Sequence, residues 1–128
     1  MANEIKTSFK ITYENGVLKH RLEPLADYPF NQTTSGFKAF TWALGSAAEE
    51  NLDLTDLTAC RLIYLRNLDP TNYCDIGMSD SGTMKALIRL LGATTYQDFC
   101  FFPLKPSTTI RGQANTAGVK VQVLGFET

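Results

Sequence analysis

The single histidine, His20, is the first residue to consider for catalysis, because an imidazole can act as a general base or a metal ligand near neutral pH. It lies between Lys19 and Arg21, with no carboxylate or cysteine close to it in the sequence. A catalytic triad or a histidine-based metal site would need partners supplied by the fold. The pattern favours a surface histidine over a catalytic base, so we expect no catalytic residue and no enzymatic activity.

The three cysteines, Cys60, Cys74 and Cys100, are the next reactive side chains. Each lies in an apolar stretch that predicts a strand, where a free thiol behaves as a small hydrophobic side chain. Their odd number and the lack of a C-x-x-C pair argue against a disulfide framework and against a metal site. We therefore predict buried free thiols, no bound metal and no cofactor.

Acidic and amide side chains form two clusters. The first is a loop that contains Glu49, Glu50, Asp53 and Asp56. A calcium loop alternates oxygen ligands around a glycine, and this stretch lacks that pattern, which favours a solvated acidic loop. In the second cluster, Asp69 and Asn72 flank Pro70. Because such side chains bond the local backbone, we assign them to a turn rather than to a ligand site.

A surface that combines basic and aromatic side chains would suit an oligosaccharide or a single-stranded nucleic acid. Its candidates are Lys38, Lys85, Arg89, Tyr96 and Phe99. A net charge of −1 and a pI near 5.8 give no basic excess, and phosphate-loop and dinucleotide motifs are missing. We expect no nucleic-acid partner, and a carbohydrate-binding or receptor-binding module is the minor alternative.

The elements that carry these residues belong to a chain of ordinary globular composition. It has 128 residues, of which 44% are hydrophobic and 20% charged, and this predicts one domain over residues 1–128. No apolar run approaches the roughly 18 residues of a membrane span. The first residues, Met1 to Lys6, lack the hydrophobic segment of a signal peptide. We expect a protein made and used from the cytoplasm, with no membrane partner.

The stretch from Ala59 to Gly77 organises the expected fold. Leu62 to Leu65 is apolar on both faces, which predicts a strand that is covered on both sides and lies centrally in its sheet. Turn-forming residues follow from Asn67 to Asn72, and Tyr73 to Ile76 restarts an extended pattern. Two such runs around a turn predict a β-hairpin.

Further strands are expected on both sides of this stretch. Ile5–Tyr13 alternates in polarity, and Asn15-Gly16 predicts a hairpin into Val17–Leu22. The loop Gly45–Thr58 is expected to cross to the centre, with Leu52, Leu54 and Leu57 tucked beneath the sheet. The remaining expected strands are Phe30–Thr34, Phe37–Leu44, Thr83–Leu91, Phe99–Phe102, Thr108–Ala114 and Val119–Phe126.

Eight or nine short strands at regular spacing predict an all-β, mainly antiparallel sandwich of jelly-roll-like form. The expected core consists of Phe9, Ile11, Leu62, Tyr64, Ile76, Ile88, Phe101, Val121 and Val123. Several strands carry apolar residues on both faces, and two sheets offer only two inward faces. Some of this apolar surface is therefore expected to lie outside, where a large patch marks an interface.

The second half of the chain resembles a family of small structural proteins of tailed bacteriophage virions. The resemblance rests on the turn motif N-L-D-x-T-N-[YF]-x-x-[IV]-G at Asn67–Gly77, the apolar segment Phe102–Pro106, A-N-T-A at Ala114–Ala117 and the final strand Val119–Phe126. It covers residues 59–126 well and residues 1–58 loosely. The chain departs from the family at Leu91–Asp98, where a longer segment replaces a short L-x-P-G-E-like turn.

The resemblance implies a non-enzymatic virion structural protein that works through protein–protein contacts. A capsid decoration or cement protein is the leading expectation, with the major capsid protein or neighbouring virion proteins as partners. A neck or tail component is the alternative. Because closed symmetric assemblies are the rule for homo-oligomers, a homo-oligomer is expected, and a trimer would suit the decoration role.

Overall fold

The structure is a computed structural model that describes residues 3–7, 11–15, 18–22, 28–32 and 36–127, with side chains from residue 36 onward. Its contacts divide the chain into two compact units, Met1–Ser35 and Gly36–Thr128. The single domain expected over residues 1–128 stays a prediction. Within the described part of the chain, no helix has the length and apolarity to cross a membrane.

The first unit contains two antiparallel ladders. β1 (Asn3–Thr7) pairs with β4 (Tyr28–Gln32), and β2 (Ile11–Asn15) pairs with β3 (Leu18–Leu22). Asn15 is the partner of Leu18, which confirms the hairpin expected at Asn15-Gly16. The single strand expected over residues 5–13 is wrong, because β1 and β2 belong to different ladders. Phe9 lies outside the described residues, as does the side chain of Ile11.

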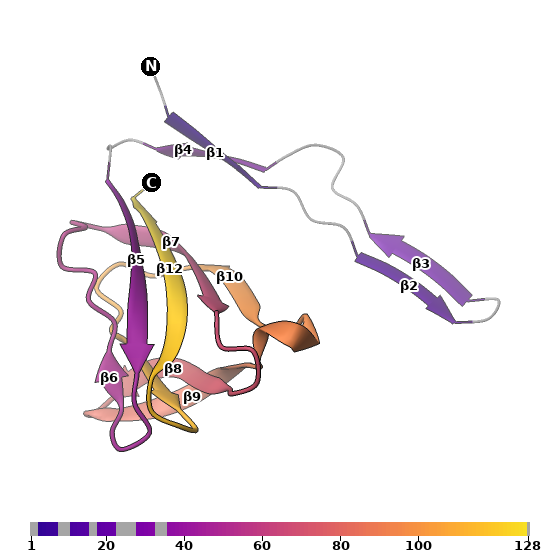
Figure 1. Cartoon of the computed structure of the whole chain (residues 1–128). Coiled ribbons are helices and arrows are strands. Elements are labelled where there is room, and N and C mark those ends of the chain that lie inside the picture. The colour runs from indigo at the N-terminus through magenta and orange to yellow at the C-terminus, as the bar shows by residue number, and fades with distance from the viewer. Residues whose placement is uncertain (1–2, 8–10, 16–17, 23–27, 33–35, 128) are drawn as a thin grey trace. The chain divides into compact units, whose positions relative to one another are not determined.

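The second unit is an antiparallel β-sandwich of two four-stranded sheets, which confirms the predicted fold class (Figure 1). In sheet order, sheet 1 consists of β10 (Phe99–Pro103), β7 (Cys60–Asn67), β12 (Val119–Glu127) and β5 (Phe37–Leu44). Sheet 2 consists of β6 (Glu50–Asn51), β11 (Ile110–Ala114), β8 (Cys74–Asp80) and β9 (Thr83–Leu90). A 3-10 turn, η1 (Ala93–Thr95), precedes β10.

The connection from β7 to β8 is not the expected hairpin. β7 lies inside sheet 1, between β10 and β12, whereas β8 lies inside sheet 2. The central position predicted for Leu62–Leu65 is confirmed, but the turn after it carries the chain from one sheet to the other. A hairpin and a crossover both need polar turn residues, and here the partners of the two strands decide between them.

The core lies between the two sheets. Eight of its members come from β7, from β12 or from the loop before β7: Leu52, Leu57, Cys60, Ile63, Leu65, Val119, Val121 and Val123. Trp42 spans the two sheets, because its ring lies against the backbone of Gly112 in β11. A Cβ at Gly112 would lie 2.6 Å from Cη2 of Trp42, so only glycine fits there without a shift.

Most of the expected core residues that the structure describes are buried at least in part. Leu62, Ile76, Val121 and Val123 are fully buried, while Tyr64 and Ile88 are half-buried. Phe101 was predicted wrongly, since 39% of it is exposed. It alternates with Cys100 and Phe102 along β10 and therefore points to the outer face of sheet 1.

The cysteines are free thiols in apolar surroundings, as predicted. Cys60 and Cys74 are buried and Cys100 is half-buried. Burial raises the pKa of Cys74 to about 12 and that of Cys100 to about 11. These thiols therefore stay protonated at neutral pH, and a protonated thiol is a poor nucleophile.

Candidate interaction surface

The polar turn after β7 is a structural lock that is centred on Asn67. This residue is fully buried, and its Nδ2 donates to the carbonyl oxygens of Asn72 (2.7 Å), Leu90 (3.3 Å) and Leu91 (3.0 Å). Its Oδ1 accepts from the backbone N–H of Asp69 at 2.9 Å. One side chain thus joins the end of β7, the turn and the end of β9.

Asp69 and Asn72 hold the same turn, which confirms the role predicted for them. The Asp69 carboxylate accepts from the backbone N–H groups of Asn72 (2.7 Å) and Thr71 (2.9 Å). These two hydrogen bonds lower the pKa of Asp69. Oδ1 of Asp69 accepts both of these bonds, and the motif Asn67–Asn72 holds the turn.

The outer face of sheet 1 carries two continuous rows of apolar side chains across all four strands. β-Pairing places them in register, and side chains of paired residues share one face. The first row is Pro103, Leu62, Phe126 and Phe37. The second row is Phe101, Tyr64, Leu124 and Ala39. We call these eight residues the apolar face. Leu62 is fully buried and adds no solvent-accessible area to it, whereas Phe37 and Phe101 are exposed.

Several aromatic rings of this region reach solvent. Phe37 is 54% exposed at one end of the first row, and its ring lies 5.2 Å from that of Phe126. Phe99, which follows beyond the second row, is 57% exposed and stacks at 6.1 Å on Tyr64. Isolated exposed apolar residues are normal, but a contiguous aromatic patch marks a contact surface.

An aromatic hollow of about 300 Å³ adjoins the apolar face. It is lined by Tyr64, Arg66, Tyr96, Asp98 and Phe99. Arg66 Nε donates to Asp98 Oδ2 at 2.8 Å, and this bond lowers the pKa of the buried Asp98. Tyr96 is 89% exposed and has a left-handed backbone with φ of 59°, an uncommon conformation for a bulky residue.

The outer face of sheet 2 has the opposite character. Arg89 forms a two-point ion pair with Asp75, at 2.7 and 2.9 Å, and its guanidinium lies 4.0 Å from the centre of the Tyr73 ring. Arg111 bonds Glu49 at 2.7 Å and Asn51 at 2.8 Å. Its charged groups are paired with one another, and its exposed apolar side chain in β9, Leu87, lies among them instead of in a row of apolar residues.

The structure does not assemble the basic and aromatic surface considered from the sequence. Lys85 and Arg89 lie in β9 of sheet 2, and Lys38 of sheet 1 pairs with Asp53 and Asp56 of the long loop. Tyr96 and Phe99 line the aromatic hollow instead, with Tyr64 and Arg66. The sequence offered no signal for that grouping, because β7 and β10 meet only through long-range pairing.

The acidic loop is divided among several partners rather than gathered around a cation. Asp53 and Asp56 face Lys38, Glu49 binds Arg111, and Glu50 accepts from the N–H of Gly45 at 2.9 Å. Among the described residues, no group of three or more His, Cys, Asp and Glu could hold a metal ion. His20 lies in β3, outside the described side chains.

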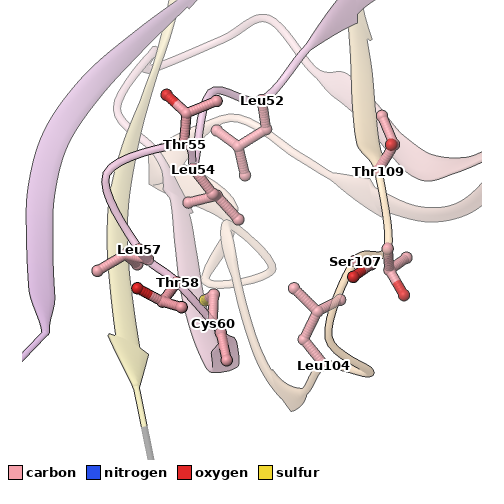
Figure 2. Close-up of a pocket in the computed structure, with 11 residues that line it drawn as sticks. Leu52, Leu54, Thr55, Leu57, Thr58, Cys60, Leu104, Ser107 and Thr109 are labelled. Atoms are coloured by element: carbon pink, nitrogen blue, oxygen red, sulfur yellow. The ribbon is translucent and has the colours of Figure 1, made fainter. Parts of the chain in front are cut away.

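Two pockets lie at the open edges of the sandwich. The first has a volume of about 230 Å³ and is shown in Figure 2. It is lined by leucines, by Cys60 and by hydroxyl side chains such as Thr55, Thr58 and Ser107. No acid or basic side chain lines it. The second, of about 250 Å³, has an apolar lining with Leu87 and Phe102, and Lys105 as its charged group. Neither combines the nucleophile and base that hydrolytic chemistry needs.

Fold and surface together define a β-sandwich with one polar, self-paired outer face and one apolar outer face. Comparison of the chain with family models, with curated proteins and with solved structures finds no match.

Proposed function

We propose that this protein is a non-enzymatic structural component of a bacteriophage virion that acts through protein–protein contacts. Its role is capsid decoration, and its partners are the major capsid protein or neighbouring virion proteins. The contact surface is the apolar face together with the aromatic hollow. The observation that carries the proposal is the continuous pair of apolar rows across sheet 1.

Burial of the exposed apolar side chains of sheet 1 against a partner would be favourable. Apolar area that leaves water contributes roughly 25 cal/mol per Å², and exposed phenylalanine rings such as Phe99 and Phe101 offer much of that area. Binding energy at interfaces concentrates on aromatic residues and arginine. The apolar face and the hollow provide both, on a rigid sheet that loses little side-chain freedom upon contact.

The virion assignment is supported by the resemblance of residues 59–126 to tailed-phage structural proteins. A neck or tail position is the alternative within the same class. Cosedimentation of the purified protein with capsids and, separately, with tails of the phage that encodes it tests the proposal. We expect it to pellet with capsids, and pelleting with tails alone would move it to the neck or tail.

Matched variants locate the contact. Phe101→Glu places a charge in the apolar face, and Leu87→Glu places one on sheet 2, at a side chain that is 63% exposed in β9. We expect Phe101→Glu to abolish cosedimentation and Leu87→Glu to leave it unchanged. Equal binding by both variants, or no binding by the unmodified protein to either particle, would contradict the proposal.

A carbohydrate-binding or receptor-binding module is the second candidate, favoured by the aromatic hollow. Its rings suit the apolar face of a sugar, and Arg66 and Asp98 supply polar groups beside them. Titration calorimetry against a panel of neutral and acidic oligosaccharides tests this role. Saturable heat that disappears in Tyr96→Ala would replace the structural role by this one.

A further inference from the structure

We infer that the apolar face binds the same face of a second copy of this chain about a two-fold axis, with Tyr96 of each copy entering the aromatic hollow of the other. The inference rests on the proposed function, because it takes the apolar face to be a protein contact. It goes further in naming a second copy as the occupant of this face in the free protein, which a virion partner would displace, and in naming the anchoring residue.

The charge of the apolar face and the hollow allows a contact between two copies. A two-fold contact brings each residue type against the same surface, so a patch with net charge would repel itself. The two apolar rows contain no charged residue, and the only ions lining the hollow are Arg66 and Asp98, already paired at 2.8 Å. The region is thus neutral, and it meets its own copy without repulsion. A strongly charged partner would meet no opposite charges on this surface.

The second argument concerns Tyr96. Nearly the whole side chain is exposed, yet it stands at the rim of a hollow walled by the near-parallel rings of Tyr64 and Phe99. A two-fold axis close to this rim sets Tyr96 of each copy over the other copy's hollow. Aromatic rings favour the offset or edge-to-face contacts available there.

Arg66 gives the incoming ring a polar partner. Among the contacts of the described side chains, its guanidinium donates to Asp98 through Nε only, which leaves the terminal nitrogens for an acceptor. The phenol oxygen of Tyr96 accepts such a bond. Half of the Arg66 side chain, 47%, is exposed before the contact forms. Tyrosine and arginine in one pocket are the usual composition of an interface hot spot.

The third argument is area. With strands about 4.8 Å apart and about 3.3 Å per residue, the two rows, which span three residues on each of four strands, cover roughly 20 by 10 Å. Two such faces with their hollows bury several hundred Å² in total, roughly the size of weak, transient interfaces. The pair should therefore be a reversible dimer whose population rises with concentration, rather than a permanent one.

Sedimentation velocity of the full chain over a range of concentrations tests the inference. The unmodified protein should shift from monomer to dimer and stop there. Tyr96→Ala and Phe101→Glu should each weaken the dimer at least tenfold. Leu87→Glu is the matched control: Leu87 is 63% exposed in β9 of sheet 2, so the charge should leave the dimer unchanged. Circular dichroism melting of every variant verifies that it is folded.

The outcomes separate this inference from the proposed function. A closed trimer, open growth, or a dimer broken by Leu87→Glu but not by Tyr96→Ala would overturn the two-fold contact. A strict monomer that still pellets with capsids, and loses that binding in Phe101→Glu, would overturn the inference and support the proposed function. A dimer that binds no particle supports the contact and contradicts the virion role.

Discussion

The two outer faces of the sandwich differ in the polarity of the side chains that they expose to solvent. On sheet 2, Arg89 with Asp75 and Arg111 with Glu49 pair their charges within the face and keep the rest wet. On sheet 1, the same architecture presents two apolar rows, with Phe37 and Phe101 exposed. A sandwich needs only one apolar face on each sheet. On the second apolar face of sheet 1, the buried Leu62 contributes to the packing, whereas the exposed Phe37 and Phe101 do not.

The difference between the two faces indicates which surface to test for function. Folding explains the inward residues of both sheets and the polar outer face of sheet 2. It does not explain why an outer face should keep phenylalanine, which lowers solubility. The contrast depends on the crossover after β7, which assigns β7 and β8 to different sheets. Changes to that crossover, to the packing between sheets and to each face should therefore have graded effects.

The largest effect is expected at Asn67. Asn67→Ala removes the donor to three carbonyl oxygens and leaves buried polar groups without partners, which should cost about 3 kcal/mol of unfolding free energy. Urea denaturation followed by the fluorescence of Trp42 measures it. The exposed Gln122 in the same sheet gives the control, since Gln122→Ala should change stability by less than about 0.5 kcal/mol. Equal losses for the two variants would contradict the lock.

A smaller loss is expected for Gly112→Ala. The new methyl group would lie 2.6 Å from Cη2 of Trp42, so the ring or the strand must shift, at a cost of about 1–3 kcal/mol. The two sheets should then move apart slightly, and Trp42 fluorescence should change in position as well as in midpoint. An unchanged denaturation midpoint would show that the indole does not hold the sheets together.

Low pH should destabilise the turn that connects β7 to β8. The folded-state pKa of Asp69 is lowered mainly by the N–H groups of Asn72 and Thr71, so its contribution is complete at neutral pH and is lost as the pH falls toward and below its ordinary value of 3.8. The denaturation midpoint should therefore decline from about pH 5 downward. Asp69→Asn should show a shallower decline. A decline of the same steepness in that variant would exclude Asp69 as its source.

The smallest effect is expected for the ion pair on sheet 2. Arg89 and Asp75 are both partly exposed, and such pairs contribute about 0.2–1 kcal/mol. A double-mutant cycle with Arg89→Ala and Asp75→Ala measures the coupling, which high salt should reduce. A coupling above about 2 kcal/mol would show that the polar face is a structural element as important as the crossover.

The sequence predicted those parts of the fold that local pattern controls. Aromatic content favoured a strand over a short helix at Phe37–Leu44, and alternation predicted most of β12. The apolar neighbours of the cysteines predicted buried thiols. The excess of apolar residues in Leu62–Leu65 and Phe99–Phe102 indicated that some would lie outside. Turn chemistry could not separate a hairpin from a crossover, because that choice depends on which strands β7 and β8 meet.

The hollow illustrates what the sequence could not supply. Tyr64 and Phe99 come together because β7 pairs with β10, and that register sets Phe99 opposite Arg66. Tyr96 joins them through the turn at η1, where it is the residue that follows the 3-10 turn. Phe101 was wrongly predicted in the core, because the apolar run Phe99–Phe102 does not show which of its side chains point inward.

The hydrogen bonds of Asn67 also bear on how chains of this kind can diverge. Since the Asn67–Asn72 motif is occupied with joining the two sheets, selection for folding alone would preserve it. The exposed residues of the two outer faces, such as Phe101 and Leu87, carry no such constraint and can vary. Chains that share the motif should therefore share an architecture while differing in their partners, because the residues that select a partner would lie on the faces and not in the motif.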